Sequence, residues 1–307
     1  MGPATVSLEF GCAIVFRETT LMSRYPNLAR AIDGVHVLAG QRPLSASELS
    51  ERFGDRIAIV IPAYNEAENL DGVLPRIPAR IGGVPAAVLL LDDGSIDGTA
   101  EAALAAGFVV ARLPENRGGG AALWAGYSLM LDAGARIVVT MDADGQHRPE
   151  ELEQVVEPVL SGRADLSQGS RVLGSAEPGA FARELGIAFF NRFVRVITGV
   201  RITDCSNGFR AMLPEVLPEL DLRQPQFHAA EFLIEAVTRG FRLEEVPVRV
   251  LGRQHGSSKK PPALRYGWGF HWAIVSAWRR ALLRSAPRRR IRRHPAAESP
   301  PAERAGA

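Results

Sequence analysis

The stretch IVVTMDADGQH, residues 137–147, joins a run of apolar side chains to a turn of polar ones. Ile137–Met141 has the β-branched composition of a buried strand. Asp142, Asp144 and Gln146 follow it at every second position. Oxygen ligands at this spacing suit a hard divalent cation, Mg²⁺ or Mn²⁺, which takes part of its coordination shell from substrate phosphates. A solvated acidic turn is the alternative interpretation.

Similar apolar runs lie on both sides of this stretch and alternate with segments of helical pattern. The other expected strands are Ile57–Ile61, Ala86–Leu91, Phe108–Ala111 and a weaker run, Asp165–Gly169. The expected helices are Glu66–Ile77, Asp97–Ala106, Gly118–Ala133 and Pro149–Leu160. This alternation predicts an α/β fold in which helices cover both faces of a mostly parallel central sheet.

Polar residues follow three of the expected strands. The carboxyl ends of parallel strands meet at one edge of the sheet, where such sheets bind their ligands. We therefore expect Asn65-Glu66, Asp92-Asp93 and Asp142-Asp144 to line one crevice. Asp93 suits a contact to a base or a ribose, whereas Asp97 suits the cap of the next helix.

A glycine-rich segment, Asn116–Gly120, opens one of the expected helices. Glycines at a helix N-terminus allow close approach of a phosphate, and close packing against the sheet is the alternative. Neither a G-x-G-x-x-G fingerprint nor a Walker A loop is present, so the sequence does not favour the dinucleotide-binding or P-loop classes.

The alternation fades after residue 170. An amphipathic helix is expected around Phe189 and Phe193, a further helix over Phe227–Arg239 and a strand over Leu243–Val250. We divide the chain into an N-terminal extension (1–54), an α/β domain (55–260), an aromatic and basic helical segment (261–294) and a disordered tail (295–307).

The charge of the chain is unevenly distributed. The formal net charge is +2, yet eight arginines lie between Arg279 and Arg293, so the remainder is net acidic by 6. This pattern indicates a basic tail rather than a nucleic-acid-binding body. The longest charge-free run, Gly118–Leu131, has 14 residues, which is short for a membrane-spanning helix. With no secretory signal apparent, we expect a cytoplasmic protein.

Three of the four tryptophans, Trp268, Trp272 and Trp278, precede this arginine cluster. At 100° per residue they fall within one broad arc, together with Arg279. A helix lying at the cytoplasmic membrane face is one interpretation, because tryptophan and arginine both favour that interface. A helix packed on the domain, followed by a solvated basic tail, is the other.

Several motifs occur in an order that resembles family 2 glycosyltransferases. They are PAYNE at 62–66, DDGS at 92–95, DADGQH at 142–147, GSR at 169–171, TDCSNGFR at 203–210, EVPV at 245–248 and RQHGSSK at 253–259. The branch that they most resemble is the dolichyl- or polyprenyl-phosphate hexose synthases. This resemblance implies a GT-A fold, an α/β/α sandwich that binds a GDP- or UDP-hexose donor, a divalent cation, Mg²⁺ or Mn²⁺, and inversion at the anomeric carbon.

The resemblance also implies roles for single residues. The nucleotide-sugar contacts would come from Pro62, Tyr64, Glu66, Leu91, Asp93, Asp142, Ala143, Asp144, Gln146, Arg171, Arg253 and Lys259. Among these, Asp142, Asp144 and Gln146 would hold the metal, and Arg171, Arg253 and Lys259 would bind phosphate. Glu231 matches an acidic residue of the acceptor half.

Our hypothesis is an inverting transfer of a hexose from a nucleotide sugar to a polyprenyl phosphate. The alternative is transfer to a soluble or protein-bound hydroxyl acceptor. The candidate catalytic residues are Asp144, Arg171, Asp204 and Glu231. An ionised phosphate needs no strong base, whereas a hydroxyl must be deprotonated, for which Asp204 or Glu231 would be the candidates.

Overall fold

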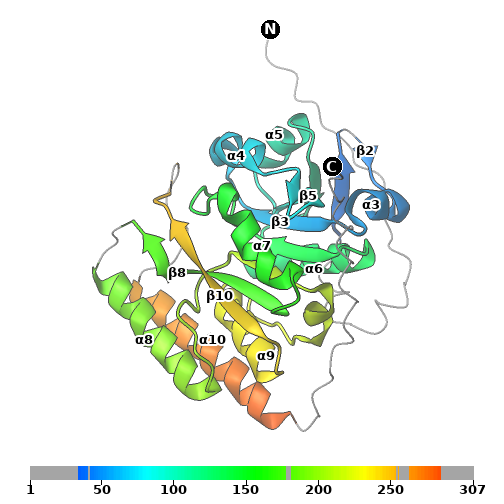
Figure 1. Ribbon diagram of the computed structural model, residues 1–307. Coiled ribbons are helices and arrows are strands. Elements are labelled where there is room, and N and C mark those ends of the chain that lie inside the picture. The colour runs from blue at the N-terminus through cyan, green and yellow to red at the C-terminus, as the bar shows by residue number, and fades with distance from the viewer. Residues whose placement is uncertain (1–33, 41, 178–180, 254, 256–262, 285–307) are drawn as a thin grey trace, which may run out of the picture.

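A mixed sheet of ten strands forms the centre of the computed structural model, which describes residues 34–40, 42–177, 181–253, 255 and 263–284 (Figure 1). The strands are β1 (His36–Ala39), β2 (Arg42–Pro43), β3 (Ile57–Ala63), β4 (Arg80–Ile81), β5 (Val84–Asp92), β6 (Val109–Arg112), β7 (Ile137–Thr140), β8 (Leu166–Ala176), β9 (Arg210–Met212) and β10 (Leu243–Val250). Their order is β10-β8-β9-β7-β3-β5-β6-β1-β2, and β4 pairs with β5.

The middle of this sheet is parallel. β3 pairs in parallel with both β5 and β7, and β5 pairs in parallel with β6. Antiparallel pairing occurs on either side, where β9 lies between β7 and β8 and where β1 pairs with β6. The predicted α/β class with a mostly parallel centre is confirmed.

Helices cover both faces of the sheet. They are α3 (Ala46–Phe53), α4 (Ala67–Val73), α5 (Thr99–Ala105), α6 (Gly119–Asp132), α7 (Leu152–Leu160), α8 (Phe181–Thr198), α9 (His228–Thr238) and α10 (Ala263–Leu283). Three short 3₁₀ turns, η2 (Leu74–Arg76), η3 (Pro149–Glu151) and η4 (Pro214–Glu219), complete the described elements. Helices α4, α5 and α7 share one hydrophobic cluster with the sheet, and α3, α6, α9 and α10 share the other.

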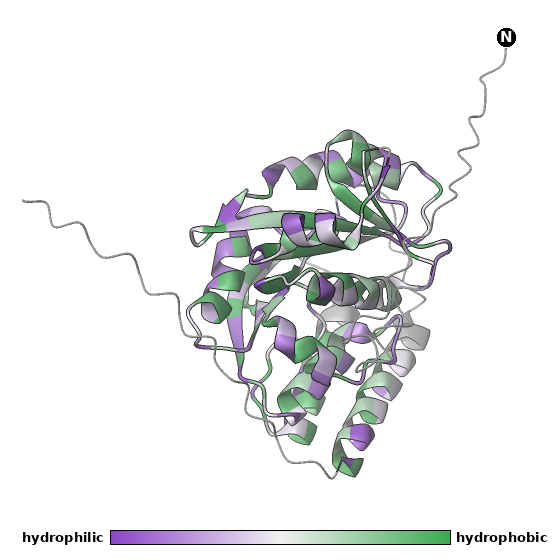
Figure 2. Cartoon of the chain, turned by 90° about the vertical axis from the view of Figure 1, so that its right-hand side faces the viewer, coloured by the Kyte–Doolittle hydropathy of each residue, from purple (hydrophilic) through white to green (hydrophobic). Residues whose placement is uncertain are grey.

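Strand β3 shows why two faces are needed. Ile57, Ile59 and Ile61 belong to one cluster and Ala58 and Val60 to the other, because successive side chains of a strand point to opposite faces. A strand buried on both faces reads as a continuous apolar run. Figure 2 shows this contrast, with hydrophobic strands inside and helices that carry both hydrophobic and hydrophilic residues.

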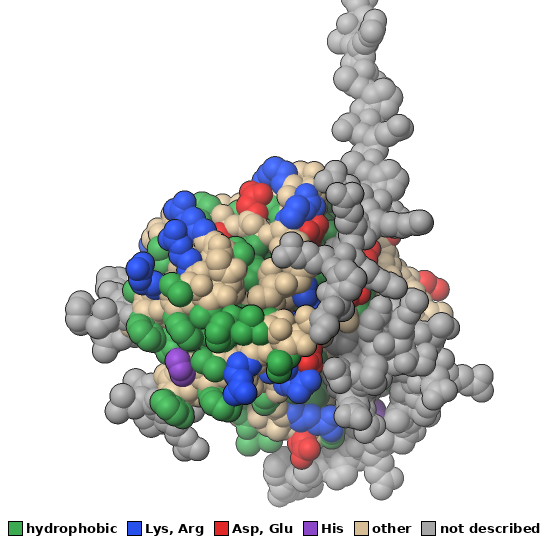
Figure 3. All heavy atoms as spheres, turned by 90° about the horizontal axis from the view of Figure 1, so that it is seen from below, with side chains coloured by type: hydrophobic (Ala, Val, Ile, Leu, Met, Phe, Trp, Pro, Cys, Tyr) green, Lys and Arg blue, Asp and Glu red, His purple; other side chains and the backbone are tan. Residues whose placement is uncertain are grey.

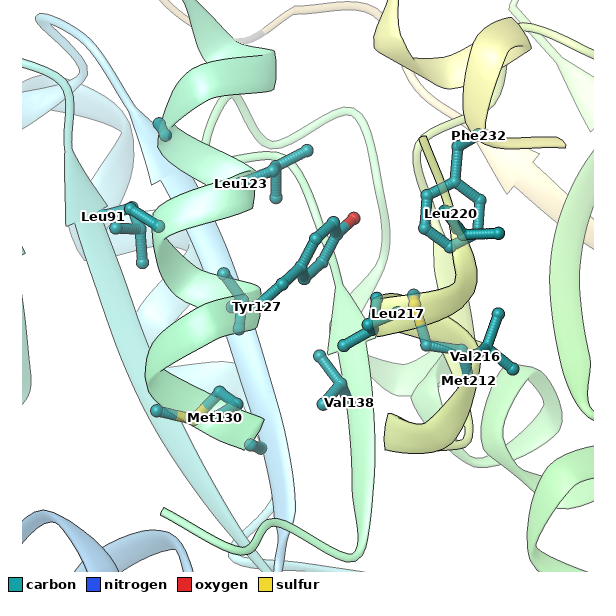
Figure 4. Packing of buried hydrophobic residues seen from close by; sticks show 14 of the residues in the cluster. Leu91, Leu123, Tyr127, Met130, Val138, Met212, Val216, Leu217, Leu220 and Phe232 are labelled. Atoms are coloured by element: carbon teal, nitrogen blue, oxygen red, sulfur yellow. The ribbon is translucent and has the colours of Figure 1, made fainter. Parts of the chain in front are cut away.

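Helix α6 packs closely on the sheet (Figure 4). Gly126 allows this approach, since a Cβ there would lie 2.6 Å from Val60 Cγ1 and 3.1 Å from Leu91 Cδ2. On its other side α6 contacts α9, where the Tyr127 and Phe232 rings lie 6.0 Å apart. Helix α6 therefore connects the parallel strands to the second half of the molecule.

The packed core extends into the segment 1–54. Strand β1 adds an antiparallel edge to β6, and Leu49 and Phe53 of α3 are buried in the cluster that contains α6. Ser45 caps α3 in a capping box with Glu48. The division of the chain at residue 54 stays a prediction, although the sheet itself crosses it.

Helices α8, α9 and α10 form a layer at one end of the molecule (Figure 1). Phe190 of α8 packs edge-on against Phe270 of α10 with ring centroids 4.8 Å apart, and Phe193 stacks on His271 at 5.2 Å. The helix expected after residue 260 is therefore present as α10. The predicted disordered tail, 295–307, lies outside the described residues.

Candidate functional site

The loops that follow β3 and β5 are hydrogen-bonded to each other. The Asn65 N–H donates to Ser95 Oγ at 2.9 Å, and the Ile96 N–H donates to Asn65 Oδ1 at 2.9 Å. Asn65 has a positive φ of 52°, which asparagine tolerates better than most residues. The Glu66 N–H donates to Thr99 Oγ1 at 2.9 Å. The ends of β3 and β5 therefore converge as expected, and hydrogen bonds between side chains and backbone hold them together.

Asp93 is buried at the end of β5. Its carboxylate accepts hydrogen bonds from the Arg117 N–H at 2.7 Å and the Gly118 N–H at 2.8 Å. Burial raises the pKa of Asp93, and these two donors oppose that rise. Asp93 therefore fixes the turn that begins α6, and its contact to a base or ribose stays a prediction. Asp97 accepts from the Thr99 N–H at 3.0 Å, but the N-cap of α5 is Gly98, so the predicted capping position of Asp97 is wrong by one residue.

The glycines that open α6 are required by packing. A Cβ at Gly120 would lie 2.5 Å from the Gln224 carbonyl oxygen, and the Gly120 N–H donates to Pro225 O at 2.7 Å. Gly120 is therefore closely packed, but against the loop 223–225 and not against the sheet as the second interpretation predicted. The loop 223–225, from the second half of the chain, thus meets the first turn of α6.

Asp142, Ala143, Asp144 and Gln146 lie together after β7. The Asp142 side chain is 49% exposed and that of Asp144 is 15% exposed. The Gln146 side chain donates to Leu251 O at 3.0 Å, and the Gln146 N–H donates to Asp144 Oδ1 at 3.1 Å. Ala143 is buried. The turn therefore presents two carboxylates of different exposure on a bonded backbone.

The electrostatics of this pair fit a divalent cation. Burial and the neighbouring charge of Asp142 raise the pKa of Asp144. A cation would relieve this repulsion. Within the described part of the chain no cluster of three or more histidine, cysteine or acidic side chains is placed to hold a metal. Two carboxylates fit Mg²⁺ or Mn²⁺ bound jointly by protein and diphosphate, since such ions keep sites for water and phosphate oxygens.

Arg253 bridges two sides of the crevice. Its guanidinium forms an ion pair with Glu66 after β3 and lies 3.4 Å from Asp144 Oδ2 after β7. Glu66 in turn accepts from Asn69 Nδ2 at 2.7 Å. The expected phosphate-binding cation is thus adjacent to the expected metal ligand. Lys259 lies outside the described residues.

Arg171 and Asp204 neutralise each other. Arg171 Nε lies 2.7 Å from Asp204 Oδ2, and the Arg171 N–H donates to the same oxygen at 3.1 Å. Asp204 is fully buried. The other Asp204 oxygen accepts from Ser206 Oγ at 3.2 Å. As placed, Asp204 offers no carboxylate to an acceptor hydroxyl.

Glu231 has a similar position in α9. Its carboxylate accepts from the Arg223 and Gln224 N–H groups, both at 2.8 Å, and forms an ion pair with Arg280 of α10. Burial raises the pKa of Glu231, which these partners oppose. Glu231 therefore fixes the loop 223–225 that meets α6, and it joins α9 to α10.

The remaining nucleotide-loop residues differ in exposure. Pro62 and Tyr64 are half-buried at the end of β3, whereas Leu91 is fully buried against α6. The Leu91 side chain thus belongs to the core. Its expected contact to a base stays a prediction.

Glu245 of β10 is a residue of this site for which no role was predicted from the sequence. Its carboxylate accepts from the Thr203 N–H at 2.7 Å and the Asp204 N–H at 3.0 Å. Glu245 thereby fixes the loop that carries Asp204. The signal was an acidic residue inside an apolar strand pattern, which requires a partner when half-buried.

A family model described as glycosyl transferase family 2 matches residues 58–221. The chain belongs to glycosyltransferase family 2. A polyprenol monophosphomannose synthase from Mycolicibacterium smegmatis is 36% identical over 234 residues, which cover 72% of this chain and 87% of that protein. An undecaprenyl-phosphate mannosyltransferase from Micrococcus luteus is 33% identical over 215 residues, covering 66% and 87%. The predicted family is thus confirmed.

A solved structure supports the GT-A expectation. Glucosyl-3-phosphoglycerate synthase from Mycobacterium tuberculosis, in complex with Mn²⁺, uridine diphosphate and glucosyl-3-phosphoglycerate, superposes with a TM-score of 0.59 at 25% identity. The match covers 77% of this chain and 85% of that one. No helix among the described residues combines the length and the apolar composition needed to cross a membrane.

Proposed function

We propose that this glycosyltransferase moves a hexose from a GDP- or UDP-hexose to a polyprenyl phosphate with inversion at the anomeric carbon. In this reaction a phosphate oxygen of the acceptor forms the bond to the anomeric carbon. The bond from that carbon to the diphosphate breaks, and the nucleoside diphosphate leaves with its electron pair. The attacking oxygen carries no proton at neutral pH, so no base is needed.

The observation that carries this choice is the state of the two candidate bases. Asp204 and Glu231 are both fully buried and both engaged in ion pairs. A general base must reach the proton that it removes. Transfer to a hydroxyl acceptor is therefore the weaker candidate. The names of the two bacterial relatives agree with a lipid phosphate acceptor and make mannose the first sugar to test.

In this proposal Asp142, Asp144 and Gln146 would hold Mg²⁺ or Mn²⁺, and the Gln146 N–H also fixes the turn through its bond to Asp144. When bound there, the cation would supply positive charge to the leaving diphosphate. Arg253 exchanges part of its pairing with Glu66 and Asp144 for the diphosphate, and Lys259 is proposed to join it. Pro62, Tyr64 and Asp93 remain the proposed contacts to the nucleoside.

We also propose peripheral contact with a membrane through α10. Trp268 and Trp272 are 75% and 58% exposed, while Phe270 and Ile274 are buried against the domain. The helix thus presents Trp268 and Trp272 outward with Arg279 exposed on the same side, whereas Trp278 packs against the core and does not join that face. Such a face suits the interface of an anionic bilayer.

The direct test supplies the protein with GDP- and UDP-hexoses, Mg²⁺ or Mn²⁺ and a polyprenyl phosphate, and looks for the glycolipid by mass spectrometry. We expect a polyprenyl-phosphate hexose from at least one donor and none when the metal is chelated. Turnover only with a soluble acceptor would refute the proposal.

A further inference from the structure

A groove of about 400 Å³ lies between the carboxyl end of β8 and helix α8. Its walls combine apolar side chains, including Val172, Ile187 and Ile202, with the arginines Arg171, Arg192 and Arg195. Apolar walls with a few polar groups are typical of sites for small amphipathic ligands. Sequence analysis gave no role to Arg192 or Arg195.

The two arginines on α8 have no counter-charge among the described residues. Arg192 and Arg195 are three positions apart, which places them on one side of the helix. Both are exposed, and neither forms an ion pair or a side-chain hydrogen bond with any described residue. Arg171, by contrast, is neutralised by Asp204. The free positive charge of the groove therefore comes from α8.

One loop, residues 203–208, connects the groove to the acidic turn 142–146. Asn191 accepts from the Cys205 N–H at 2.9 Å and so fixes the loop 203–208 below the groove. At the other end of this loop, a Cβ on Gly208 would lie 3.3 Å from Asp142 Oδ1, and Thr140 Oγ1 donates to Gly208 O at 2.6 Å. A ligand in the groove would thus lie one loop away from Asp142.

The groove also opens beside an apolar surface. Exposed hydrophobic side chains gather on α8, on α10 and at the end of β8, and they include Val172, Leu173, Phe189, Val196, Trp268 and Trp272. Figure 3 shows this end of the molecule, with apolar side chains next to Lys and Arg side chains. The exposed hydrophobic side chains Val172 of β8, at the groove, and Phe189 and Val196 of α8 would offer apolar contacts to a chain that leaves the groove.

We propose that this groove binds the phosphate and the first isoprene units of a polyprenyl phosphate, with Arg192 and Arg195 pairing with the phosphate. This inference rests on the proposed function and extends it to the acceptor site. Two guanidinium groups match the charge of a phosphate monoester. The apolar walls match the isoprene chain, whereas a soluble phosphorylated acid would leave them uncovered.

The test compares two double variants of equal net charge. R192Q/R195Q removes the proposed phosphate ligands. R52Q/R201Q removes two exposed arginines that lie outside the groove and have no ion pair with a described residue. Binding of farnesyl phosphate, inorganic phosphate and 3-phosphoglycerate is measured by calorimetry in the presence of Mn²⁺ and nucleoside diphosphate. Nucleoside diphosphate binding itself reports that each variant is folded.

We expect farnesyl phosphate to bind the wild type more tightly than either soluble phosphate compound. R192Q/R195Q should weaken that binding about tenfold or more, as expected for loss of charge-assisted contacts, while R52Q/R201Q stays within about twofold. Equal affinities in the two variants would overturn the proposal. Preference for 3-phosphoglycerate would overturn the lipid as occupant.

The same variants separate this inference from the proposed function. Suppose that wild-type protein transfers hexose to polyprenyl phosphate and that R192Q/R195Q leaves the KM for that acceptor unchanged. The proposal that the groove binds the acceptor is then wrong, and the proposed function is retained. If farnesyl phosphate binding depends on the two arginines but no glycolipid forms with any donor, the groove stands and the proposed function fails.

Discussion

Among the described residues, charged side chains are paired in one region of the molecule and unpaired in another. The first region is the crevice formed by the loops after β3, β5 and β7, and the second is the surface of α8 and α10. In the crevice, carboxylates are bonded to neighbouring loops, as with Asp93 and the first turn of α6. On the α8–α10 surface, Arg192 and Arg195 lack partners among the described residues, and tryptophans are exposed. The backbone of the crevice is therefore held in place by hydrogen bonds within the protein. On the α8–α10 surface the charged and aromatic side chains are exposed, and a bound lipid would cover them.

The largest effect is expected in the crevice. Asp144→Asn replaces a charged ligand with a neutral one in a site that must hold a dication, so kcat/KM should fall about 100-fold or more. The matched control is Asp71→Asn, because Asp71 is an exposed carboxylate of α4. Activity of the Asp144 variant within threefold of wild type at saturating Mn²⁺ would remove Asp144 from the metal site.

The junction between the two regions is tested by stability. Glu231→Gln removes the nearest of three carboxylates around Arg280, because Asp221 and Glu235 also lie 3.7 Å from its Nε, so the free energy of unfolding should fall by about 2 kcal/mol. Urea titration measures this change. Glu215→Gln, at an exposed position in η4, should change it by about 0.5 kcal/mol at most. Similar stability of the two variants would mean that the Glu231 ion pair does not join α10 to the domain.

The bridging arginine should affect donor binding. Arg253→Gln removes a cation that we propose pairs with the diphosphate, so the Kd for nucleoside diphosphate should rise about tenfold with Mn²⁺ present. The control is Arg249→Gln, since Arg249 is exposed on β10. Protease cleavage between residues 253 and 260 should slow when nucleoside diphosphate and metal are added. A Kd within twofold of wild type would place the diphosphate elsewhere.

The smallest effect is expected at the membrane face. Trp268→Ser with Trp272→Ser keeps the net charge but removes exposed aromatic area, so affinity for anionic vesicles should fall about fivefold. Co-sedimentation at low and high salt measures this, and binding should weaken as salt rises. Failure of the wild type to co-sediment at low salt would instead favour a soluble acceptor or a separate membrane partner.

The parallel strands and the acidic turn 142–146 could be predicted because their signals are local, whereas the metal in that turn stays a prediction. Buried strands such as β7 are continuous apolar runs, and the acidic turn follows directly. Strand β9 has only three residues and begins with the buried Arg210, so it shows no apolar run. The state of Glu231 depends on Arg280, 49 positions away, and no local pattern reports such a partner. The candidate acidic residues could therefore be identified from the sequence, but not which of them form ion pairs in the folded protein.

The central claim is that the acceptor is a phosphate and that no base is needed. The most direct measurement is a competition in which wild-type protein, metal and one nucleotide sugar meet equal amounts of a polyprenyl phosphate and the corresponding polyprenol. We expect mass spectrometry to find hexose only on the phosphate, with inverted anomeric configuration. Glycosylation of the free polyprenol at a comparable rate would contradict the account, because it would require a base that neither Asp204 nor Glu231 supplies as placed.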